Sequence, residues 1–550
     1  MTTPDVLEFD YVIVGGGSAG AVLAARLSEE ASHRVALVEA GGEAKALLVQ
    51  VPVGFARLVG HQTLDWRYEQ FPDASIDGRR FLWSAGKLLG GGSSINGQVY
   101  IRGTREDFDH WRRAGAVGWG YDDVLPYFMR SERWSGAPSQ TRGAYGPLSV
   151  APMRDAHPLC AAFLKGCAEL GLPTLDDYNT GDMEGAFLTQ ASQRDGWRCS
   201  TEKAYLRPAR SRPNLEVFTH TQAENIVFDG RRAVGVMGVR GDRRMEIRAR
   251  GEVILSAGAM GSPALLLRSG VGAGDALQSL GVPVVLDSPE VGRNLQEHCA
   301  TSQNRFVNQP TLNSQVGPLD MLGHAWRFIS ARKGPFGSPP VQAMALARTR
   351  DDLDEPDIHL NFMPMAYDLD PSSTSSAGMQ MPKEPAVTIV AAVTHPHSRG
   401  RIVLGADRRP RIDHQIIGDG RDVETLIRGM RMIERLFETA AFAPLAPTRR
   451  TPASAPVSDE AWAAFIRAKT MIAYHPVGSC RMGADPAAVV DPQLRVVGCD
   501  GLRVADASIM PRVTSTNTNA AAIMIGEKAA VMIKRAGLVS VSTPDAPPGP

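Results

Sequence analysis

The chain has 550 residues, of which 43% are hydrophobic and 21% charged, the balance of a soluble globular protein with several domains. Lysine plus arginine and aspartate plus glutamate number 59 each, so no excess positive charge is available for nucleic acid or an anionic membrane surface. Six cysteines without a CxxC pair argue against a disulfide framework and a structural zinc site, and we expect no metal. The N-terminus lacks a secretory pattern and no apolar stretch is long enough to span a bilayer, so we expect a cytoplasmic protein without stable membrane insertion.

The first forty residues have the pattern of a dinucleotide-binding βαβ unit. An apolar, β-branched run at 10–15 predicts a buried strand, and the GxGxxG sequence at 15–20 follows it directly. Helix formers at 19–27 and a second apolar run at 35–38 predict a helix and a second strand, which ends at Glu39. These elements predict a site for FAD or NAD, because both cofactors carry the same ADP half.

Each residue type of this unit has a physical role. The first glycine makes the turn, the second lets the pyrophosphate approach the backbone, and the third lets helix and strand pack closely. The helix N-terminus attracts the phosphate charge, and the acid accepts hydrogen bonds from a ribose. The contacts predicted here are Gly15, Gly17, Ser18, Ala19, Gly20, Glu39 and Ala40.

Further motifs extend along the chain. They are GKLLGGGSSING at 86–97, YIRG at 100–103, SAGAMGSP at 256–263, GRNLQEH at 292–298, YHPVGSCRMG at 474–483 and VADASIMP at 504–511. With the N-terminal fingerprint, they resemble the glucose–methanol–choline (GMC) flavoenzyme family, in its choline-dehydrogenase-like bacterial branch. The order and spacing of the motifs match from about residue 8 to residue 535.

The resemblance implies an α/β, Rossmann-like FAD-binding domain interrupted by an α+β substrate domain with an antiparallel sheet. The expected FAD-binding domain comprises 1–155, 205–300 and 466–539, the substrate domain comprises 156–204 and 301–465, and 540–550 form a flexible tail. The sequence agrees with this layout, because the region from 300 to 465 has no second GxGxxG and contains an apolar, β-branched segment at 386–393 that suits a sheet strand.

The resemblance also assigns FAD contacts beyond the fingerprint. The glycine-rich loop at 86–97 can follow an anion or a flat ring without side-chain clashes. Some relatives attach FAD covalently through a histidine in this loop; Ile95 occupies that position here, so we expect noncovalent FAD. The carried-over contacts are Gly90, Gly91, Ser94, Asn96, Gly97, Ala223, Ala257, Asp506, Ala507, Asn517 and Thr518.

Two residues near the C-terminus are the expected catalytic pair. His475 is the predicted base, since a neutral imidazole with a pKa of about 6.5 can take the hydroxyl proton of an alcohol while its carbon gives hydride to flavin N5. The second catalytic position of the family falls on Asn519, where an amide would hydrogen-bond the substrate oxygen. Asn517 is the competing assignment, or else an N-cap of the helix that we expect to start at Asn519 and continue over 520–535. Its positive end would face the flavin.

Three other histidines, His298, His395 and His397, are interpreted as structural, because no neighbouring acid or metal-ligand spacing accompanies them in the sequence.

The expected substrate is a neutral primary alcohol, oxidised to an aldehyde. Alignment places Gln342 where choline-using members carry a carboxylate, and a neutral amide does not offset the desolvation of a buried cation. Tyr474 is the predicted wall of an otherwise apolar pocket. The acceptor is a quinone, a cytochrome or O₂, with a dehydrogenase favoured over an oxidase, and homo-oligomerisation stays open.

Other functions remain compatible with parts of the sequence. They are an alcohol oxidase, a choline dehydrogenase, and a hydroxynitrile lyase that keeps FAD without net redox chemistry. A light-driven fatty-acid decarboxylase of the same fold lacks the catalytic histidine, and a non-enzymatic NAD-binding module would not need the C-terminal motifs.

Overall fold

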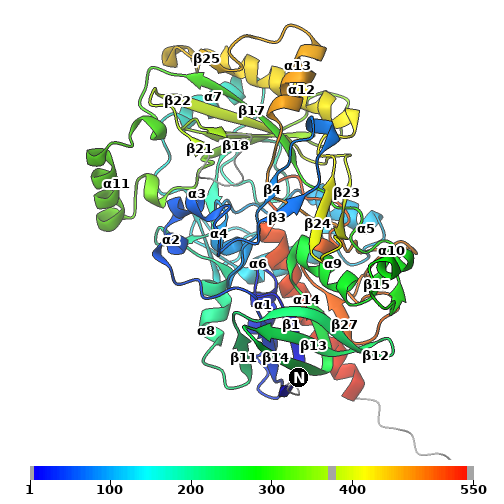
Figure 1. Cartoon of the computed structure of the whole chain (residues 1–550). Coiled ribbons are helices and arrows are strands. Elements are labelled where there is room, and N and C mark those ends of the chain that lie inside the picture. The colour runs from blue at the N-terminus through cyan, green and yellow to red at the C-terminus, as the bar shows by residue number, and fades with distance from the viewer. Residues whose placement is uncertain (1–4, 370–378, 542–550) are drawn as a thin grey trace, which may run out of the picture.

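The computed structural model describes residues 5–369 and 379–541. Two seven-stranded sheets dominate it, one in the lower half and one in the upper half of Figure 1. The predicted fold class is confirmed by this mixed α/β architecture, which includes an antiparallel sheet. The expected domain boundaries stay a prediction.

The first sheet is mainly parallel around β1. Its order is β11-β2-β1-β14-β13-β12, with β27 paired to β14. The end of β1 at 11–14 is completely buried, as expected for a central parallel strand that is covered on both faces. The strands are β1 (Asp5–Val14), β2 (Val35–Val38), β11 (Leu215–Phe218), β12 (Gln222–Asp229), β13 (Arg232–Arg240), β14 (Arg243–Leu255) and β27 (Leu502–Val504).

Two helices from opposite ends of the chain pack beside this sheet. They are α1 (Gly20–Leu27) and α14 (Asn519–Val541). A Cβ at Gly526 would lie 2.8 Å from the carbonyl oxygen of Ala19, so glycine is what allows α14 to approach α1 this closely. The helix predicted to begin at Asn519 is therefore present and lies against the nucleotide-binding unit.

The second sheet is antiparallel throughout, in the order β25-β17-β22-β19-β18-β7, with β26 paired to β17. Its outer face packs on α7 (Cys160–Glu169), α12 (Gly420–Phe437) and α13 (Asp459–Lys469). The strands are β7 (Gly185–Leu188), β17 (Cys299–Phe306), β18 (Ala343–Ala347), β19 (Ile358–Met363), β22 (Ala386–Val393), β25 (Thr448–Thr451) and β26 (Met471–Ile472).

Smaller elements complete the fold. A four-stranded sheet has the order β23-β24-β3-β4, and α11 projects at the left of Figure 1. These elements are β3 (Tyr68–Gln70), β4 (Leu82–Trp83), β23 (Gly400–Leu404), β24 (Pro410–His414), α5 (Arg105–Arg113), α6 (Tyr121–Ser131), α9 (Gly258–Arg268) and α11 (Pro318–Ala331).

Several local expectations can be compared with these elements. The strands predicted at 10–15, 35–38 and 386–393 correspond to β1, β2 and β22. All six cysteines are free and buried. No helix in the described part of the chain is both long and apolar enough for a membrane span. The expected tail at 540–550 lies outside the described residues, apart from 540–541, which end α14.

Candidate active site

A cavity of about 880 Å³ connects the two sheets. One end is lined by the N-terminal fingerprint, including Gly17 and Glu39, and the other by His475 and the inner face of the second sheet. Residues more than 400 positions apart in the sequence therefore face one continuous space.

The fingerprint glycines occupy positions where a side chain does not fit. Gly15 has φ +99°, and a Cβ there would lie 2.5 Å from the carbonyl oxygen of Ser256. A Cβ at Gly20 would lie 1.9 Å from the carbonyl oxygen of Gly15. Gly20 was also predicted as a FAD contact but does not line the cavity, so the structure agrees with its packing role alone, whereas Gly15, Gly17, Ser18 and Ala19 do line it.

Glu39 lies at the end of β2, is buried, and lines the cavity together with Ala40. Its two carboxylate oxygens accept the backbone N–H groups of Gly16 at 2.8 Å and Gly41 at 2.7 Å. Burial raises the pKa of Glu39, while these hydrogen bonds favour its charged form. Among the described residues, each oxygen accepts one backbone N–H, so both retain capacity for ribose hydroxyls.

The glycine-rich loop lies against the fingerprint. Gly91 has φ +50°, and a Cβ there would lie 2.7 Å from the Cα of Gly17. Of the contacts predicted in this loop, Gly91, Asn96 and Gly97 line the cavity, and so does Ile95.

Two predicted contacts in this loop do not line the cavity. They are Gly90 and Ser94. The hydroxyl of Ser94 is fully buried and donates to the carbonyl oxygen of Leu89 at 2.8 Å, so it stabilises the loop from behind.

Sequence reasoning missed the residue that holds this loop. The buried guanidinium of Arg198 donates to the backbone oxygen of Asn96 at 2.7 Å, to its side-chain oxygen at 2.9 Å and to the carbonyl of Ser93 at 3.2 Å. Burial lowers the pKa of Arg198 to about 9. No sequence motif surrounds this arginine, and only the fold shows its role.

The cavity fits FAD by the chemistry of its walls. No side chain in the described structure caps the N-terminus of α1, so backbone donors stay available to a pyrophosphate. A Cβ at Gly92 or Gly258 would meet nothing within 4 Å, so bare backbone faces the open space. The remaining carried-over contacts that line it are Ala223, Ala257, Asp506, Ala507, Asn517 and Thr518.

Asp506 faces the cavity and also accepts several hydrogen bonds from neighbouring residues. Its carboxylate accepts the backbone N–H of Gly258 at 2.9 Å, the hydroxyl of Ser262 at 2.5 Å and the backbone N–H of Ser508 at 2.8 Å. Burial raises its pKa against these hydrogen bonds. Asp506 thus joins the start of α9 to the loop after β27.

His475 is positioned by the pairing of β17 with β26, which places Cys299 opposite Ile472. This pairing brings the 292–298 motif beside the 474–483 motif. Both carboxylate oxygens of Glu297 accept the backbone N–H of His475 at 2.8 Å. Burial raises the pKa of Glu297 to about 8, although backbone hydrogen bonds favour its charged form.

The His475 ring has a hydrogen-bond partner at each nitrogen. Nδ1 lies 2.9 Å from Nδ1 of His298, and Nε2 lies 2.8 Å from the amide nitrogen of Asn517. Burial, and to a smaller extent the charge of His359, lower the pKa of His475 to about 3. The imidazole is therefore neutral at physiological pH, with a pKa far below the value near 6.5 assumed from the sequence.

In the structure Asn517, and not the predicted Asn519, contacts the ring of His475. Asn519 begins α14 and accepts a hydrogen bond from the hydroxyl of Ser18 at 2.6 Å. Its side chain thus joins the N-termini of α1 and α14, while Asn517, in the preceding loop, reaches His475. Both amides line the cavity, but a two-residue difference in a loop gives them different neighbours.

The inner face of the second sheet supplies further polar residues that sequence reasoning missed. Along β19, Ile358, Leu360 and Phe362 pack into the core, whereas His359 and Asn361 line the cavity. This period-2 alternation, Ile-His-Leu-Asn-Phe-Met, was a readable signal.

His359 is held by the loop that carries Asn517. Its Nδ1 lies 2.8 Å from the carbonyl oxygen of Ser515, so this nitrogen is the donor. Burial lowers the pKa of His359 to about 4.

Gln342 does not line the cavity, which corrects its assignment to the substrate pocket. Its side chain is fully buried, and the amide oxygen accepts the backbone N–H of His157 at 2.7 Å, just before α7 on the outer face of the sheet. Tyr474 does line the cavity, with φ +62°, a backbone conformation that is strained for a bulky residue.

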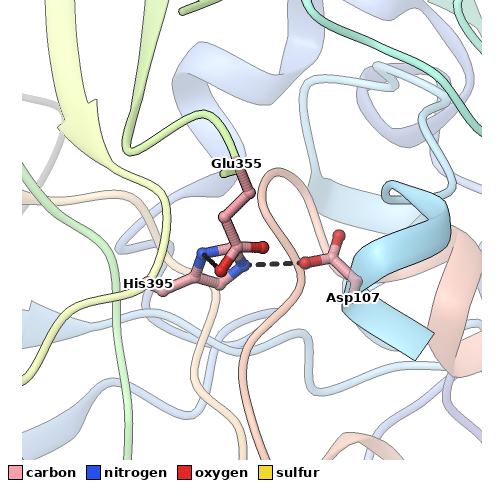
Figure 2. A group of neighbouring side chains, drawn as sticks. All are labelled: Asp107, Glu355 and His395. Atoms are coloured by element: carbon pink, nitrogen blue, oxygen red, sulfur yellow. Dashed lines mark hydrogen bonds and ion pairs between the residues drawn. The ribbon is translucent and has the colours of Figure 1, made fainter. Parts of the chain in front are cut away.

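The interpretation that no acid accompanies His395 is wrong. His395 Nε2 donates to Asp107 at 2.7 Å, and Glu355 lies 3.8 Å from its Nδ1 (Figure 2). The ligand atoms of these three residues lie within 4.8 Å of one another, but Arg512 supplies the cation, with both carboxylate oxygens of Glu355 within 3.0 Å. Burial is the largest single influence and opposes the charge of Asp107, but the interactions with His395, Arg512 and the backbone N–H of Ser515 together lower the pKa of Asp107.

This ion-pair network supports the active-site loop. Asp107 accepts both the backbone N–H and the hydroxyl of Ser515 at 2.9 Å. Because Ser515 lies two residues before Asn517, the network fixes the segment that presents the amide to His475. His397 is exposed.

Comparisons with known proteins identify the class. Models described as GMC oxidoreductase match residues 9–300 and 396–526. The chain belongs to the GMC oxidoreductase family and is a FAD-dependent oxidoreductase that acts on CH–OH donors.

Individual relatives cover nearly the whole chain. It is 38% identical over 532 residues to the oxygen-dependent choline dehydrogenase of Brucella anthropi, covering 95% of both chains. It is also 38% identical to the mitochondrial choline dehydrogenase of Mus musculus, covering 96% of this chain and 89% of the relative. The solved pyridoxine 4-oxidase from Mesorbium loti has a TM-score of 0.85 and 32% identity, covering 97% and 99% of the two chains. The cytoplasmic location stays a prediction.

Proposed function

We propose that this protein oxidises a neutral primary alcohol with an apolar or aromatic body to the aldehyde, using noncovalently bound FAD. The observation that carries the proposal is the charge of the cavity wall. The carboxylates that line it in the described structure belong to Glu39, Glu69 and Asp506. Glu69 lies 3.4 Å from Arg411, and the other two accept hydrogen bonds from the protein. None is left unpaired for the quaternary ammonium of choline, whose burial would need a compensating charge.

The wall near the second sheet suits an apolar substrate body. Methionine and small apolar side chains cluster there, and Tyr474 adds an aromatic surface. Methionine adapts its shape to flat and irregular ligands. The clustered residues that line the cavity are Ala300, Val341, Met363, Met365, Tyr367, Val390, Ala392 and Met471. The relative of 32% identity is named for pyridoxine, a substrate without a quaternary ammonium.

The catalytic roles follow from the two nitrogens that meet at the cavity. When bound, FAD supplies the hydride acceptor. His475 Nε2 takes the hydroxyl proton, since the neutral ring has a lone pair to receive it. Without substrate, the Asn517 amide donates to this nitrogen at 2.8 Å. When the alcohol binds, the amide donates to the alcohol oxygen instead and stabilises the charge that develops there. Loss of the O–H proton and of hydride from carbon leaves the aldehyde.

The test is an anaerobic titration of the purified flavoprotein. Benzyl alcohol, furfuryl alcohol, an aliphatic primary alcohol and choline are mixed separately with the oxidised enzyme, and flavin absorbance is followed. We expect a neutral alcohol to bleach the flavin and choline to leave it oxidised. Bleaching by choline alone would overturn the proposal, and absence of bleaching by every alcohol would favour a lyase.

Admission of air to the bleached enzyme then identifies the acceptor. We propose a dehydrogenase that passes electrons to a quinone or a cytochrome, so recolouring in air should be slow compared with recolouring by a soluble quinone. Fast recolouring in air would make the protein an oxidase. Acid precipitation of the protein should release the flavin into the supernatant, and flavin retained in the pellet would contradict noncovalent binding.

A further inference from the structure

His298 lies directly behind the proposed base. It ends the 292–298 motif, is fully buried, and its ring meets that of His475 edge to face at 5.1 Å with an interplanar angle of 85°. The two Nδ1 atoms are 2.9 Å apart. A contact of this length between two ring nitrogens requires one hydrogen between them, because two hydrogens would clash and two lone pairs would repel each other.

The contacts of the other nitrogen of His298, Nε2, show which of the two rings carries the hydrogen between them. Nε2 of His298 lies 2.9 Å from the carbonyl oxygen of Thr394 and 3.0 Å from that of Thr514. Carbonyl oxygens only accept, so Nε2 carries a hydrogen. Burial, with His475 and His359 nearby, lowers the pKa of His298 well below its ordinary value. The neutral ring has one hydrogen in total, so its Nδ1 has none.

The hydrogen between the rings therefore belongs to His475, on Nδ1. A neutral His475 then has a bare Nε2, and the Asn517 amide nitrogen, which donates, lies 2.8 Å from it. The carbonyls of Thr394 and Thr514, the ring of His298 and the amide of Asn517 are therefore all consistent with the same tautomer of His475. We propose that His298 is a positioning residue that holds His475 in its Nδ1–H tautomer, with the Nε2 lone pair directed to the alcohol.

This role rests on the proposed function of His475 as the base and extends it to the proton-transfer step. When the O–H bond of the alcohol breaks and its proton bonds to Nε2, His475 becomes a cation. Its Nδ1–H then donates to the His298 lone pair as a charge-assisted hydrogen bond. His298 takes up no proton itself, because burial lowers its pKa well below the ordinary value. The role corresponds to that of an orienting acid in a hydrolase triad, performed here by a neutral ring.

Glu297 complements this by holding the main chain of the same residue. It accepts the backbone N–H groups of His475 and His298, so adjacent residues of one motif fix the backbone and the ring of the base.

The direct test is nitrogen NMR of the holoenzyme labelled with ¹⁵N-histidine at neutral pH. The His475 signals are assigned by their absence from His475→Asn. We expect a protonated Nδ1 and an unprotonated Nε2 on His475, and the opposite pattern on His298. A His475 protonated at Nε2, or averaged between the tautomers, would overturn the proposal. This readout does not depend on turnover.

A matched pair of variants tests the kinetic consequence. His298→Asn keeps an oxygen near the position of Nδ1 and can still accept from His475, whereas His298→Gln keeps an amide near Nε2 but leaves His475 Nδ1–H without an acceptor. We expect His298→Gln to lower the anaerobic reduction rate on the order of 10²-fold, with KM and FAD content unchanged, and His298→Asn to retain most of the rate.

Equal losses in both variants, or a change confined to KM, would show that His298 only fills space. If neither variant folds, the NMR measurement of the His475 tautomer in the wild-type enzyme tests the proposal by itself. Normal turnover of His475→Ala would instead overturn the proposed function, while leaving the tautomer measurement intact.

Discussion

The two ends of the cavity are built differently. The nucleotide end is centred on one continuous segment, in which Gly15, Gly20 and Glu39 lie within 25 positions and their spacing is set by a strand, a turn and a helix. The alcohol end gathers His298, His475 and other residues from several elements. A local motif tolerates few backbone changes, whereas an assembled site depends on how loops and strands far apart in sequence are held against each other.

The largest effect on the reduction rate is expected at the alcohol end of the cavity. His475→Ala should lower the rate of anaerobic flavin reduction by about 10²–10⁴-fold, the usual range for losing a general base, with bound FAD retained because the nucleotide end is untouched. Stopped-flow absorbance measures the rate. His397→Ala, which removes an exposed histidine, is the control, and a His475→Ala enzyme as fast as this control would contradict the assigned base.

The next effect separates two neighbouring amides. Asn517→Ala should lower the reduction rate on the order of 10²–10³-fold, because the donor beside His475 Nε2 is removed. Asn519→Ala removes the hydrogen bond from Ser18 and should cost about 1 kcal/mol of stability with a nearly unchanged rate. The same kinetic measurement compares both variants. A larger kinetic loss in Asn519→Ala would restore the assignment made from the sequence.

The nucleotide end should respond in FAD affinity instead of rate. Gly91→Ala would bring a Cβ to 2.7 Å from the Cα of Gly17, and the strain of about 1–3 kcal/mol should weaken FAD binding roughly 10–100-fold. Fluorescence titration of the apoprotein with FAD gives the affinity. Gly241→Ala has a similar positive φ of +57° but meets no atom within 4 Å, so it should bind FAD normally. Equal losses in both would mean that backbone strain alone explains the result.

The smallest functional effect is expected at Gln342. Gln342→Glu places a carboxylate in a fully buried site beside the backbone N–H of His157, which should lower the free energy of unfolding by about 1–3 kcal/mol. It should not create choline oxidation, since the side chain does not reach the cavity. Denaturant unfolding and choline-dependent bleaching measure the two effects, with Gln342→Met as the uncharged control. Choline turnover by Gln342→Glu would return this residue to the substrate pocket.

The sequence was most informative where function is local. The βαβ spacing predicted β1, α1 and β2 and the cavity-lining glycines, because each position depends on its immediate neighbours. The start of α14 at Asn519 was likewise predicted, but the choice between Asn517 and Asn519 depends on the path of a loop. No sequence pattern states which amide a loop turns toward a distant ring.

Other errors have the same physical origin. The partners of His298 and His395, which are His475 and Asp107, were missed because they lie 177 and 288 positions away in the sequence. Gln342 was placed in the pocket by alignment, yet the sheet turns its side chain toward the region before α7. The alternation along β19 could have placed His359 on the sheet face opposite the core. It could not have shown that this face lines the active-site cavity.

A crystal structure of the holoenzyme with FAD and a bound neutral alcohol would test the central claim most directly. It should show the pyrophosphate against Gly17 and Gly91, and the alcohol oxygen within hydrogen-bond distance of both His475 Nε2 and the Asn517 amide. An alcohol oxygen held by Asn519, or a His475 ring that presents Nδ1 to the substrate, would contradict the account.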